Sequence, residues 1–448
     1  MDTLPRTLGL RDVIFLTIGS VIGSGIFLVP GSVVRQVDGF IGPALAVWLV
    51  GGVLSLLGAL TYGELGAMKP AAGGIYVYIR ECFGAFPAFL FGWTLFFVIS
   101  SGSVATLAVA FATYLGEIAP MTPLLTKLIA ILMIAIVTAV NVLGTRKSAN
   151  LQNFTTATKV IGILVMSGAL LWLGRGFQGS GVTLLPDQYK MSLLSGFGLS
   201  MIGVLWAYEG WQFVTYSAGE VVNPKRNLPL GLVVGTAALA VIYLTANLGY
   251  IAALGASEMA NSNRVASIAV ASTVNPGAAK LVALVILISI FSAANGIMLT
   301  APRVYYAMAR DGLFFEKLAK VHPKLQTPMF AIIAGAVWSA VLAATGTFDQ
   351  LLTYVVFVGW IFYALAAASV IVYRKREPET VRPYRVPGYP VTPLLFIVAA
   401  VALVLNTIVT QPTRAAIGLG MVMLGAPAYL IWNSKRSKYK SVEVEENA

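Results

Sequence analysis

The chain has 448 residues, of which 58% are hydrophobic and 11% are charged, and its formal net charge is +12. A soluble protein of this length could not bury so much apolar surface, so the composition predicts a polytopic membrane protein. A single cysteine, Cys82, and a single histidine, His322, exclude an internal disulfide and the usual His/Cys metal cluster. The sequence also lacks a Walker loop, a dinucleotide fingerprint and a serine-hydrolase elbow. We therefore expect no cofactor, no ATP-driven pump and no enzyme.

Apolar windows of about 20 residues, the length that crosses a bilayer, predict twelve transmembrane helices. In chain order they cover residues 12–37, 43–68, 85–114, 123–143, 152–173, 193–218, 229–254, 276–308, 328–346, 350–373, 390–410 and 413–433. Residues 1–11 lack a basic segment followed by a cleavable apolar core, so no signal peptide is predicted. The sequence thus predicts an all-α fold between a short N-terminal segment and a tail over residues 434–448.

Positive charge is divided unequally between the two sides of this topology. With the N-terminus in the cytoplasm, 22 of the 30 Lys and Arg residues lie inside, seven lie outside, and Lys159 lies within a span. The positive-inside rule then predicts that both termini are cytoplasmic. The net positive charge is explained by the topology and by contact with the lipid bilayer, so no nucleic-acid partner is expected.

The first predicted helix contains the segment Gly19-Ser20-Val21-Ile22-Gly23-Ser24-Gly25-Ile26-Phe27. A glycine inside a helix costs ~1 kcal/mol relative to alanine, and three glycines with two serines in seven residues favour an interruption. Broken backbone in a bilayer is tolerated only where it is buried in protein or lines a watery cavity. We therefore expect a binding site here. The alternative is that Gly19 and Gly23 serve only close helix packing.

The sixth predicted helix carries a second interruption. It is apolar from Leu193 to Leu205 and then reads Trp206-Ala207-Tyr208-Glu209-Gly210-Trp211, which places a carboxylate and a glycine at mid-membrane depth. The interrupted helices are five spans apart, and an odd offset reverses orientation across the membrane. Residues 12–173 and 193–374 can therefore form two inverted repeats, with residues 390–433 as two additional helices.

Together the two breaks predict groups that recognise an α-amino acid. The amides of Ser24, Gly25 and Ile26 open the second half of helix 1 and carry the positive partial charge of a helix N-terminus, which suits a carboxylate. The carbonyls that end the preceding half-helices carry negative partial charge, which suits an ammonium. These carbonyls belong to Val21, Ile22, Trp206 and Glu209.

These segments resemble a known family. Gly23-Ser24-Gly25-Ile26-Phe27 followed by Pro30-Gly31 resembles the helix 1 signature of the amino acid–polyamine–organocation (APC) superfamily. The second break and the exit from Gly219 to Pro229 resemble helix 6 of the L-type amino acid transporter family. Similar segments lie at residues 70–78, at 295–296 and between 302 and 328, so the resemblance covers essentially the whole chain. It points to bacterial members of the serine/threonine exchanger type.

The resemblance implies a LeuT-type five-plus-five inverted repeat with broken helices 1 and 6 plus two extra helices, working by alternating access in a bacterial inner membrane. It also implies that the substrate carboxylate binds amides of Ser24 and Gly25, with Ile26, and that the amine binds carbonyls of Val21, Trp206 and Glu209. Animal members join a heavy chain through a cysteine in the loop after helix 3. Residues 116–122 contain no cysteine, so no disulfide-linked heavy chain is expected.

Lys159 lies about two turns into the fifth predicted helix, where an ammonium is costly unless it is paired, hydrated or close to the interface. Two interpretations are open. Its side chain either extends to the nearby cytoplasmic face or, as the resemblance implies, occupies the place of a coupling sodium ion between helices 1 and 8. The second interpretation predicts a transporter that needs no sodium.

Four residues are predicted to shape side-chain selectivity: Tyr208, Glu209, Gly210 and Asn295. Glu209 either faces the pocket and selects a cationic or hydroxylated substrate, or packs against helix 10. Tyr208, together with Trp211, either closes over the substrate or packs, and Asn295 either lines the pocket or binds an unwound carbonyl. On the cytoplasmic side, Arg303 and Arg310 are predicted either to form an inner gate with an acidic partner or to anchor the topology. The possible partners are Asp311, Glu316 and Glu220.

The sequence therefore predicts a sodium-independent exchanger or carrier of small neutral L-amino acids such as serine, threonine or alanine. One alternative is a transporter of cationic amino acids or polyamines, which Glu209 favours. A second alternative, from another class, is a receptor that binds amino acids without moving them. The sequence does not indicate an oligomeric state.

Overall fold

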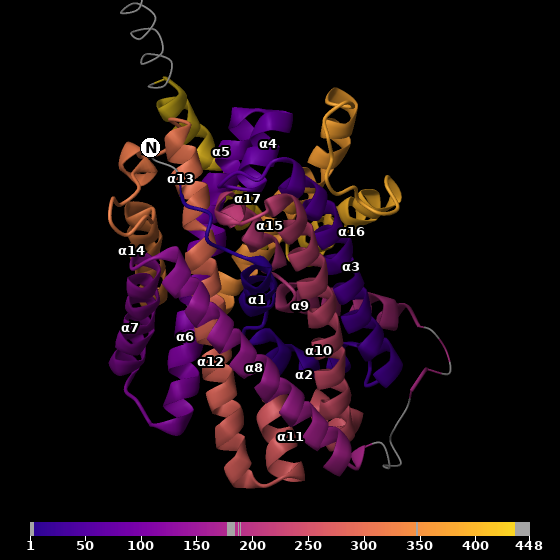
Figure 1. Ribbon diagram of the computed structural model, residues 1–448. Coiled ribbons are helices and arrows are strands. Elements are labelled where there is room, and N and C mark those ends of the chain that lie inside the picture. Colours follow the sequence, from indigo (N-terminus) through magenta and orange to yellow (C-terminus); the bar gives the residue numbers. More distant parts are fainter. Residues whose placement is uncertain (1–3, 177–183, 187, 189, 346–347, 435–448) are drawn as a thin grey trace, which may run out of the picture.

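The structure is a computed structural model that describes residues 4–176, 184–186, 188, 190–345 and 348–434. Within these residues the regular structure is helical, apart from one isolated bridge between Leu8 and Val221 (Figure 1). The predicted all-α class is therefore confirmed. Residues 1–3 of the predicted N-terminal segment and residues 435–448 of the predicted tail lie outside the described part of the chain.

The helices follow the predicted spans in order. Ten segments of the described chain are long and apolar enough to cross a membrane, and a bent pair of shorter helices adds an eleventh. The bent pair is α1 (Leu10–Val21) and α2 (Gly25–Gln36). The first five of the ten segments are formed by α3 (Ile41–Met68), by α5 (Ala85–Thr94) with η1 (Leu95–Ile99) and α6 (Ser100–Ile118), by α7 (Pro123–Val142), by α8 (Thr145–Leu173), and by α9 (Met191–Ala207) with η3 (Trp211–Glu220). The other five are formed by α10 (Pro224–Ala260), by η4 (Pro276–Ala278) with α12 (Ala279–Thr300) and α13 (Pro302–Arg310), by α15 (Phe348–Arg376) from Val358 onward, by α16 (Val391–Thr410), and by α17 (Pro412–Met423).

The remaining helices are shorter: α4 (Ile75–Phe83), α11 (Val265–Thr273), η5 (Glu316–Ala319) and α14 (Met329–Thr345). The ninth predicted span coincides with α14, which has 17 residues and is the apolar helix that falls short of a full membrane crossing by length. A polytopic helical membrane protein is thus established, and the count of twelve spans stays a prediction.

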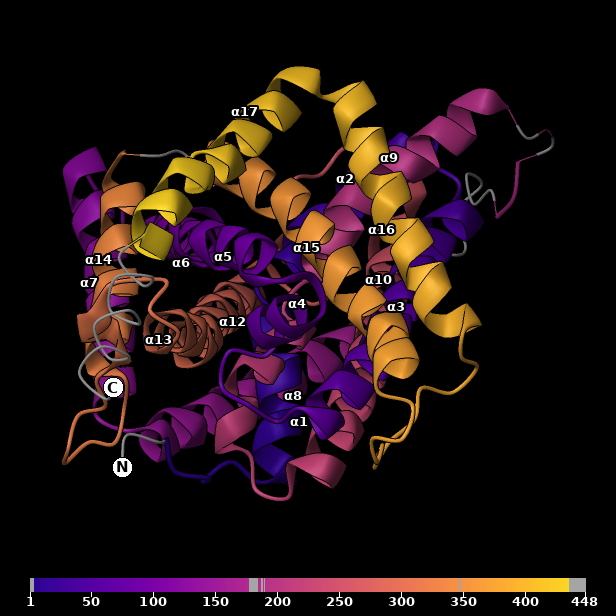
Figure 2. The same cartoon turned by 90° about the horizontal axis from the view of Figure 1, so that it is seen from above.

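The bent pair lies at the centre of the bundle. Helix α1 packs against α8, α10, α12 and η3, while α2 packs against α9 and α10 (Figure 1). Seen from above, α7 and α14 lie at one edge of the molecule and α16 at the opposite edge (Figure 2). The first break is therefore enclosed by protein on all sides, as irregular backbone at membrane depth requires.

Helix α8 shows how the surroundings orient these helices. Its buried face carries polar side chains, including Ser148, Gln152 and Lys159, whereas Phe154 and Val165 on other faces are exposed. In water this distribution would be unfavourable, but in a bilayer the apolar face is solvated by lipid and the polar groups find partners inside. The same burial explains why α8 begins at Thr145 rather than at residue 152: the hydropathy window missed a polar but internal first turn.

Candidate functional site

The first break occupies residues 22–24. Helix α1 ends at Val21, Ile22 has an extended conformation (φ −70°, ψ 93°), and α2 begins at Gly25 with its axis bent by 48°. Ser24 is the N-cap residue of α2, and its carbonyl accepts the amides of Phe27 and Leu28 at 3.1 and 3.2 Å. The helix is interrupted where the glycines and serines predict it.

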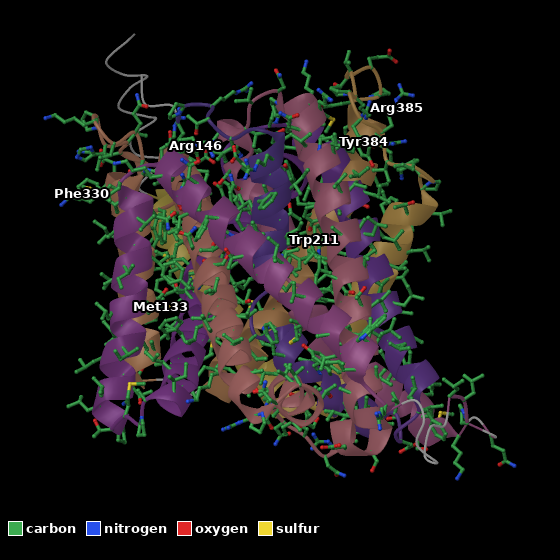
Figure 3. The ribbon with its side chains drawn as sticks, turned by 60° about the horizontal axis from the view of Figure 1, so that its bottom comes forward. Met133, Arg146, Trp211, Phe330, Tyr384 and Arg385 are labelled. Carbon is green, nitrogen blue, oxygen red and sulfur yellow. The ribbon has the colours of Figure 1, made fainter. Side chains whose placement is uncertain are left out.

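The second break occupies residues 208–210. Helix α9 ends at Ala207, and Gly210 has φ +125°, a conformation that glycine adopts without the steric cost of a side chain. The chain then continues as the 3₁₀-helix η3. Trp211, at its start, lies in the interior of the bundle, whereas Arg146 and Arg385 lie at one end (Figure 3). This interruption also matches the prediction.

The two breaks touch each other. A Cβ atom added to Gly25 would lie 2.8 Å from the Cβ and 2.9 Å from the Cα of Ala207. A Cβ added to Gly210 would lie 2.8 Å from the carbonyl oxygen of Ser20. Gly19 does serve close packing, since its added Cβ would lie 2.1 Å from Nε2 of Gln152 on α8. Packing is therefore part of the role of these glycines, but the helices also break, so packing alone does not account for the segment.

A cavity lies between the breaks. Its volume is about 50 Å³, which is room on the order of three to five waters at about 10–15 Å³ each. Its walls come from both breaks, from one face of α6 and from α12: Ser20, Val21, Gly23, Ser24, Gly25, Ser103, Thr106, Leu107, Trp206, Ala207, Glu209, Phe213, Ala293 and Ile297. The cavity suits a compact ligand.

The cavity presents amide donors on one side. Gly25 opens α2, so its amide and the next ones lack the partners that a helix interior supplies. The Ser24 side chain is 1% exposed, and its hydroxyl makes no hydrogen bond to the described residues. Together with the positive end of the α2 dipole, these groups suit a carboxylate.

Carbonyl groups of the two half-helix ends lie close together. The Tyr243 hydroxyl donates to the carbonyls of Val21 and Ala207 at 3.3 and 2.9 Å and so joins the two ends. A carbonyl oxygen has two lone pairs, so each of these groups can accept one further hydrogen bond. The Trp206 carbonyl, which was predicted to accept the substrate amine, accepts the Glu209 amide at 3.0 Å. It too can accept one further hydrogen bond.

Lys159 is completely buried and its ammonium points into the first break. Its Nζ donates to the carbonyls of Gly19 and Ile22 at 2.7 and 2.6 Å, and lies 3.5 Å from that of Ser289 on α12. The side chain therefore does not extend to the cytoplasmic face, and that interpretation was wrong. The Ile22 carbonyl, predicted for the substrate amine, instead accepts the lysine.

Glu209 combines parts of both predicted placements. It lines the cavity, and its Oε1 accepts the hydroxyl of Tyr363 on α15, the tenth predicted helix, at 2.7 Å. Its other oxygen, Oε2, is buried and makes no hydrogen bond to the described residues. One oxygen is thus used for positioning, while the other is free to accept a hydrogen bond.

Tyr208 and Trp211 point away from the cavity. The Tyr208 hydroxyl donates to the carbonyl of Trp48 on α3 at 3.2 Å, and its ring packs on Tyr243 with centroids 4.8 Å apart. The Trp211 ring packs edge-on against Tyr62 of α3. Neither residue lines the cavity, so the predicted closure over a substrate is not observed: the turn at residues 208–210 directs both rings toward α3.

Asn295 also does not line the cavity or bind an unwound carbonyl. Its side chain joins a buried network in which it donates to Gln152 at 2.9 Å and accepts from Asn141 and Ser148 at 3.0 and 3.2 Å. These residues belong to α7 and α8, so the rotation of α12 places the amide between those helices. Gly210 and Ile26 contribute backbone near the site, but their atoms do not form the cavity wall.

Two ion pairs, one of them fully buried, lie at the end of the bundle that carries the N-terminus. Arg303 on α13 donates to both oxygens of Glu220 at 2.5 and 3.1 Å, and the two side chains are 1% and 0% exposed. Thr145 at the start of α8 also donates to Glu220 at 2.7 Å. The neighbouring Arg146 donates to Asp12 on α1 at 2.6 and 2.7 Å. Of the three acidic partners considered, Arg303 pairs with Glu220, and this pair ties α8, η3 and α13 together.

The sequence analysis missed the α6 wall. Ser103, Thr106 and Leu107 are spaced i, i+3 and i+4 and therefore share one face of that helix. Two hydroxyl groups at this spacing in an apolar span are a signal that could have found them. Among the described residues, no three His, Cys, Asp or Glu side chains come together as metal ligands.

A helical membrane protein in which two discontinuous helices meet at a central cavity has the architecture of a secondary transporter. A profile of the amino acid permease family matches residues 8–426. The chain therefore belongs to this family, within the APC superfamily, and is a membrane transporter of amino acids rather than an enzyme.

Similar proteins extend this comparison. The b(0,+)-type amino acid transporter 1 of Mus musculus is 32% identical over 92% of this chain and 84% of its own length. The serine/threonine exchanger SteT of Bacillus subtilis (strain 168) is 31% identical over 95% of this chain and 96% of its own length. The cystine/glutamate transporter of Homo sapiens is 31% identical over 96% of this chain and 87% of its own length.

Proposed function

We propose that this protein exchanges small neutral L-amino acids, such as serine, threonine and alanine, across the membrane without sodium. The observation that carries the proposal is the single cavity at which both helix breaks meet. Its amide donors at Ser24 and Gly25 suit a carboxylate, and the carbonyls of Val21 and Ala207 suit an ammonium. Both groups of an α-amino acid then have complementary partners within one small volume.

The size of the cavity supports a small substrate. Space for a few waters matches an amino acid with a short side chain, whereas a long cationic side chain would require Phe213, Ile297 or Leu107 to move. The relation to the serine/threonine exchanger of Bacillus subtilis supports the same substrate class and an exchange mode.

The position of Lys159 supports sodium independence. Its ammonium already supplies a positive charge to carbonyls of α1 and lies near a carbonyl of α12. A sodium ion at the same place would need those carbonyl oxygens as ligands and would be repelled by the lysine. The protein thus carries a built-in cation where an ion-coupled carrier would bind a free one.

Alternating access follows from the same arrangement. Residues 12–173 and 193–374 are proposed as inverted repeats, each beginning with a broken helix, with residues 390–433 as the two extra helices. The Arg303–Glu220 pair and the Arg146–Asp12 pair then close the end that carries the N-terminus. That end is proposed to be cytoplasmic, since the predicted loops on this side hold most of the Lys and Arg residues. No disulfide-linked heavy chain is proposed, and Cys82 is buried with its Sγ 3.7 Å from the Ser369 carbonyl.

A second candidate function is transport of cationic amino acids. The free Oε2 atom of Glu209 favours it, because a buried carboxylate oxygen without a partner attracts a positively charged side chain. A polyamine would leave the amides at Ser24 and Gly25 without a carboxylate, so the cationic amino acid is the stronger form of this alternative.

Uptake by proteoliposomes tests these proposals. The purified full chain is reconstituted, the vesicles are preloaded with serine, alanine, lysine or buffer, and uptake of labelled serine is measured while sodium and pH are varied separately. We expect uptake only with internal serine or alanine, and equal rates in sodium and choline. Uptake into buffer-loaded vesicles contradicts obligatory exchange, and sodium-dependent uptake contradicts the role of Lys159.

The same vesicles separate the alternatives. Preferred exchange with lysine would replace the first proposal by the cationic one. Specific binding of serine with no uptake under any gradient would favour a receptor that does not move its ligand.

A further inference from the structure

Many helical serine and threonine hydroxyls in the described part of the bundle donate to their own backbone. A hydroxyl in a helix commonly donates to the carbonyl four residues earlier, and on α6 Thr113 does so, with 2.9 Å to the Val109 carbonyl. The same pattern recurs at Thr17, Ser55, Thr61, Thr138, Thr245, Ser289, Thr300 and Ser339. A helical hydroxyl that departs from it is free for another partner.

Thr106 departs from this pattern. Its side chain is 2% exposed, it lines the cavity, and its Oγ1 makes no hydrogen bond to the described residues. Buried hydroxyls without a hydrogen bond within the described chain also occur at Thr94, Ser101, Ser167 and Thr236, but Thr106 lines the cavity, where a ligand or water can satisfy this costly group. Thr106 thus adds to the cavity wall a polar group that comes from α6 rather than from either helix break.

The location of Thr106 fits contact with a substrate side chain. Its neighbour Leu107 lies beside the first break, because a Cβ added to Gly23 would be 3.4 Å from Leu107 Cδ2. In the proposed binding mode the two breaks hold the carboxylate and the amine, which are common to all α-amino acids. The side chain must then face the remaining walls, to which α6 contributes Ser103, Thr106 and Leu107.

Few free polar atoms are available to such a side chain. Among the described residues that line the cavity, the buried side-chain atoms without a hydrogen bond are Ser20 Oγ, Ser24 Oγ, Thr106 Oγ1 and Glu209 Oε2. Ser20 lies in the last turn of α1 and Ser24 in the first break, and Glu209 Oε2 belongs to a carboxylate that accepts but does not donate when ionised. Thr106 Oγ1 can both donate and accept. Ser103 presents a second hydroxyl on the same wall but is only partly buried, and the remaining neighbours Leu107, Ala293 and Ile297 are apolar.

We infer that Thr106 is a specificity-determining residue that recognises the β-hydroxyl of serine or threonine by a hydrogen bond through its Oγ1. This inference rests on the proposed function and names the substrate class within it. When a substrate without a hydroxyl closes the site, water leaves and Thr106 stays unpaired. A substrate with a hydroxyl avoids that loss, so the site favours serine over alanine.

The test compares substrates that differ only in the hydroxyl. In proteoliposomes, unlabelled serine and alanine compete with labelled alanine uptake, and threonine and 2-aminobutyrate form a second pair. The variants are Thr106→Val, which keeps the shape and removes the hydroxyl, Thr106→Ser, which keeps a hydroxyl, and Thr113→Val as the control on the same helix.

We expect the preference for serine over alanine to fall about fivefold to tenfold in Thr106→Val, the value of one hydrogen bond. Alanine affinity should change by less than about twofold, because alanine makes no use of the hydroxyl. Thr106→Ser and Thr113→Val should keep the wild-type preference. Thermal stability of Thr106→Val should not fall, since the deleted hydroxyl has no partner in the protein.

Each other outcome is informative. An unchanged serine preference in Thr106→Val, or an equal loss for serine and alanine, overturns the role of Thr106. Wild-type uptake of alanine without any preference for serine also overturns it while leaving the proposed function intact. If wild-type protein takes up neither alanine nor serine, the proposed function itself fails, and the two failures are thereby distinguished.

Discussion

The two helix breaks differ in what they offer to a ligand. The first, at residues 22–24, has no side chain larger than serine facing the cavity and contributes mainly backbone groups. The second, at residues 208–210, carries Glu209, whose carboxylate both binds Tyr363 and leaves one oxygen free. Backbone geometry thus dominates one side of the site and side-chain chemistry the other.

This difference divides recognition into two parts. Backbone amides and carbonyls can bind only the groups that all α-amino acids share, so the first break sets the substrate class. In the proposed binding mode, Glu209 and Thr106 line the part of the cavity that faces the variable side chain, so we expect them to set selectivity within the class. Changes at the first break are therefore expected to abolish transport, and changes at the second to alter preference.

The largest expected effect is on stability, at the end of η3, the helix that follows the second break. Replacing Glu220 by Gln leaves the buried Arg303 guanidinium without its counter-charge, which costs about 3–5 kcal/mol when one partner of a buried pair is removed. We expect a clear fall in the thermal unfolding temperature of purified protein, with the exposed Glu258→Gln as control. An unchanged temperature would show that η3 needs no anchor at this end.

The next effect is at the first break itself. Gly25→Val places a branched side chain where even a Cβ lies 2.8 Å from Ala207, and we expect uptake of every amino acid to fall by about a hundredfold or more. Gly168→Val is the matched control, because a Cβ there meets no atom within 4 Å. Normal substrate affinity in Gly25→Val would remove the first break from the site.

Lys159 connects the first break to its surroundings. Lys159→Met nearly keeps the length of the side chain but leaves the carbonyls of Gly19 and Ile22 without the ammonium donor. We expect uptake to fall about tenfold to a hundredfold for serine and alanine alike. The exposed Lys127→Met is the control. If Lys159→Met changes the ratio between substrates rather than the common rate, the division between the two breaks is incorrect.

The smallest effect is expected at Glu209. Glu209→Gln retains an oxygen for the Tyr363 hydroxyl and removes the negative charge, so transport should persist. We expect the relative inhibition by lysine and serine to shift about threefold to tenfold against lysine. Competition against labelled alanine measures this shift. Unchanged selectivity would mean that the role of Glu209 is limited to its hydrogen bond with Tyr363 on α15.

Sequence analysis located both breaks because their cause is local. Glycine and serine disfavour a continuous helix wherever the chain runs, so Gly23-Ser24-Gly25 and Gly210 mark the interruptions without knowledge of their neighbours. It also identified the unusual position of Lys159 within a span, but left its orientation open. Tyr208 and Trp211 were considered for the site because they flank the second break, and Asn295 because of its place in the eighth predicted helix. The structure turns all three side chains elsewhere.

What the sequence by itself determined is the class of the molecule: a helical membrane protein, interrupted at two places, with a charge distribution that predicts its topology. The tertiary structure alone decided which atoms meet. The rotation of each helix about its axis depends on packing with neighbours distant in sequence, and it selects the face that reaches the cavity. For this reason Lys159 reaches Gly19 and Ile22, and Thr106 joins the site although no local pattern links it to either break.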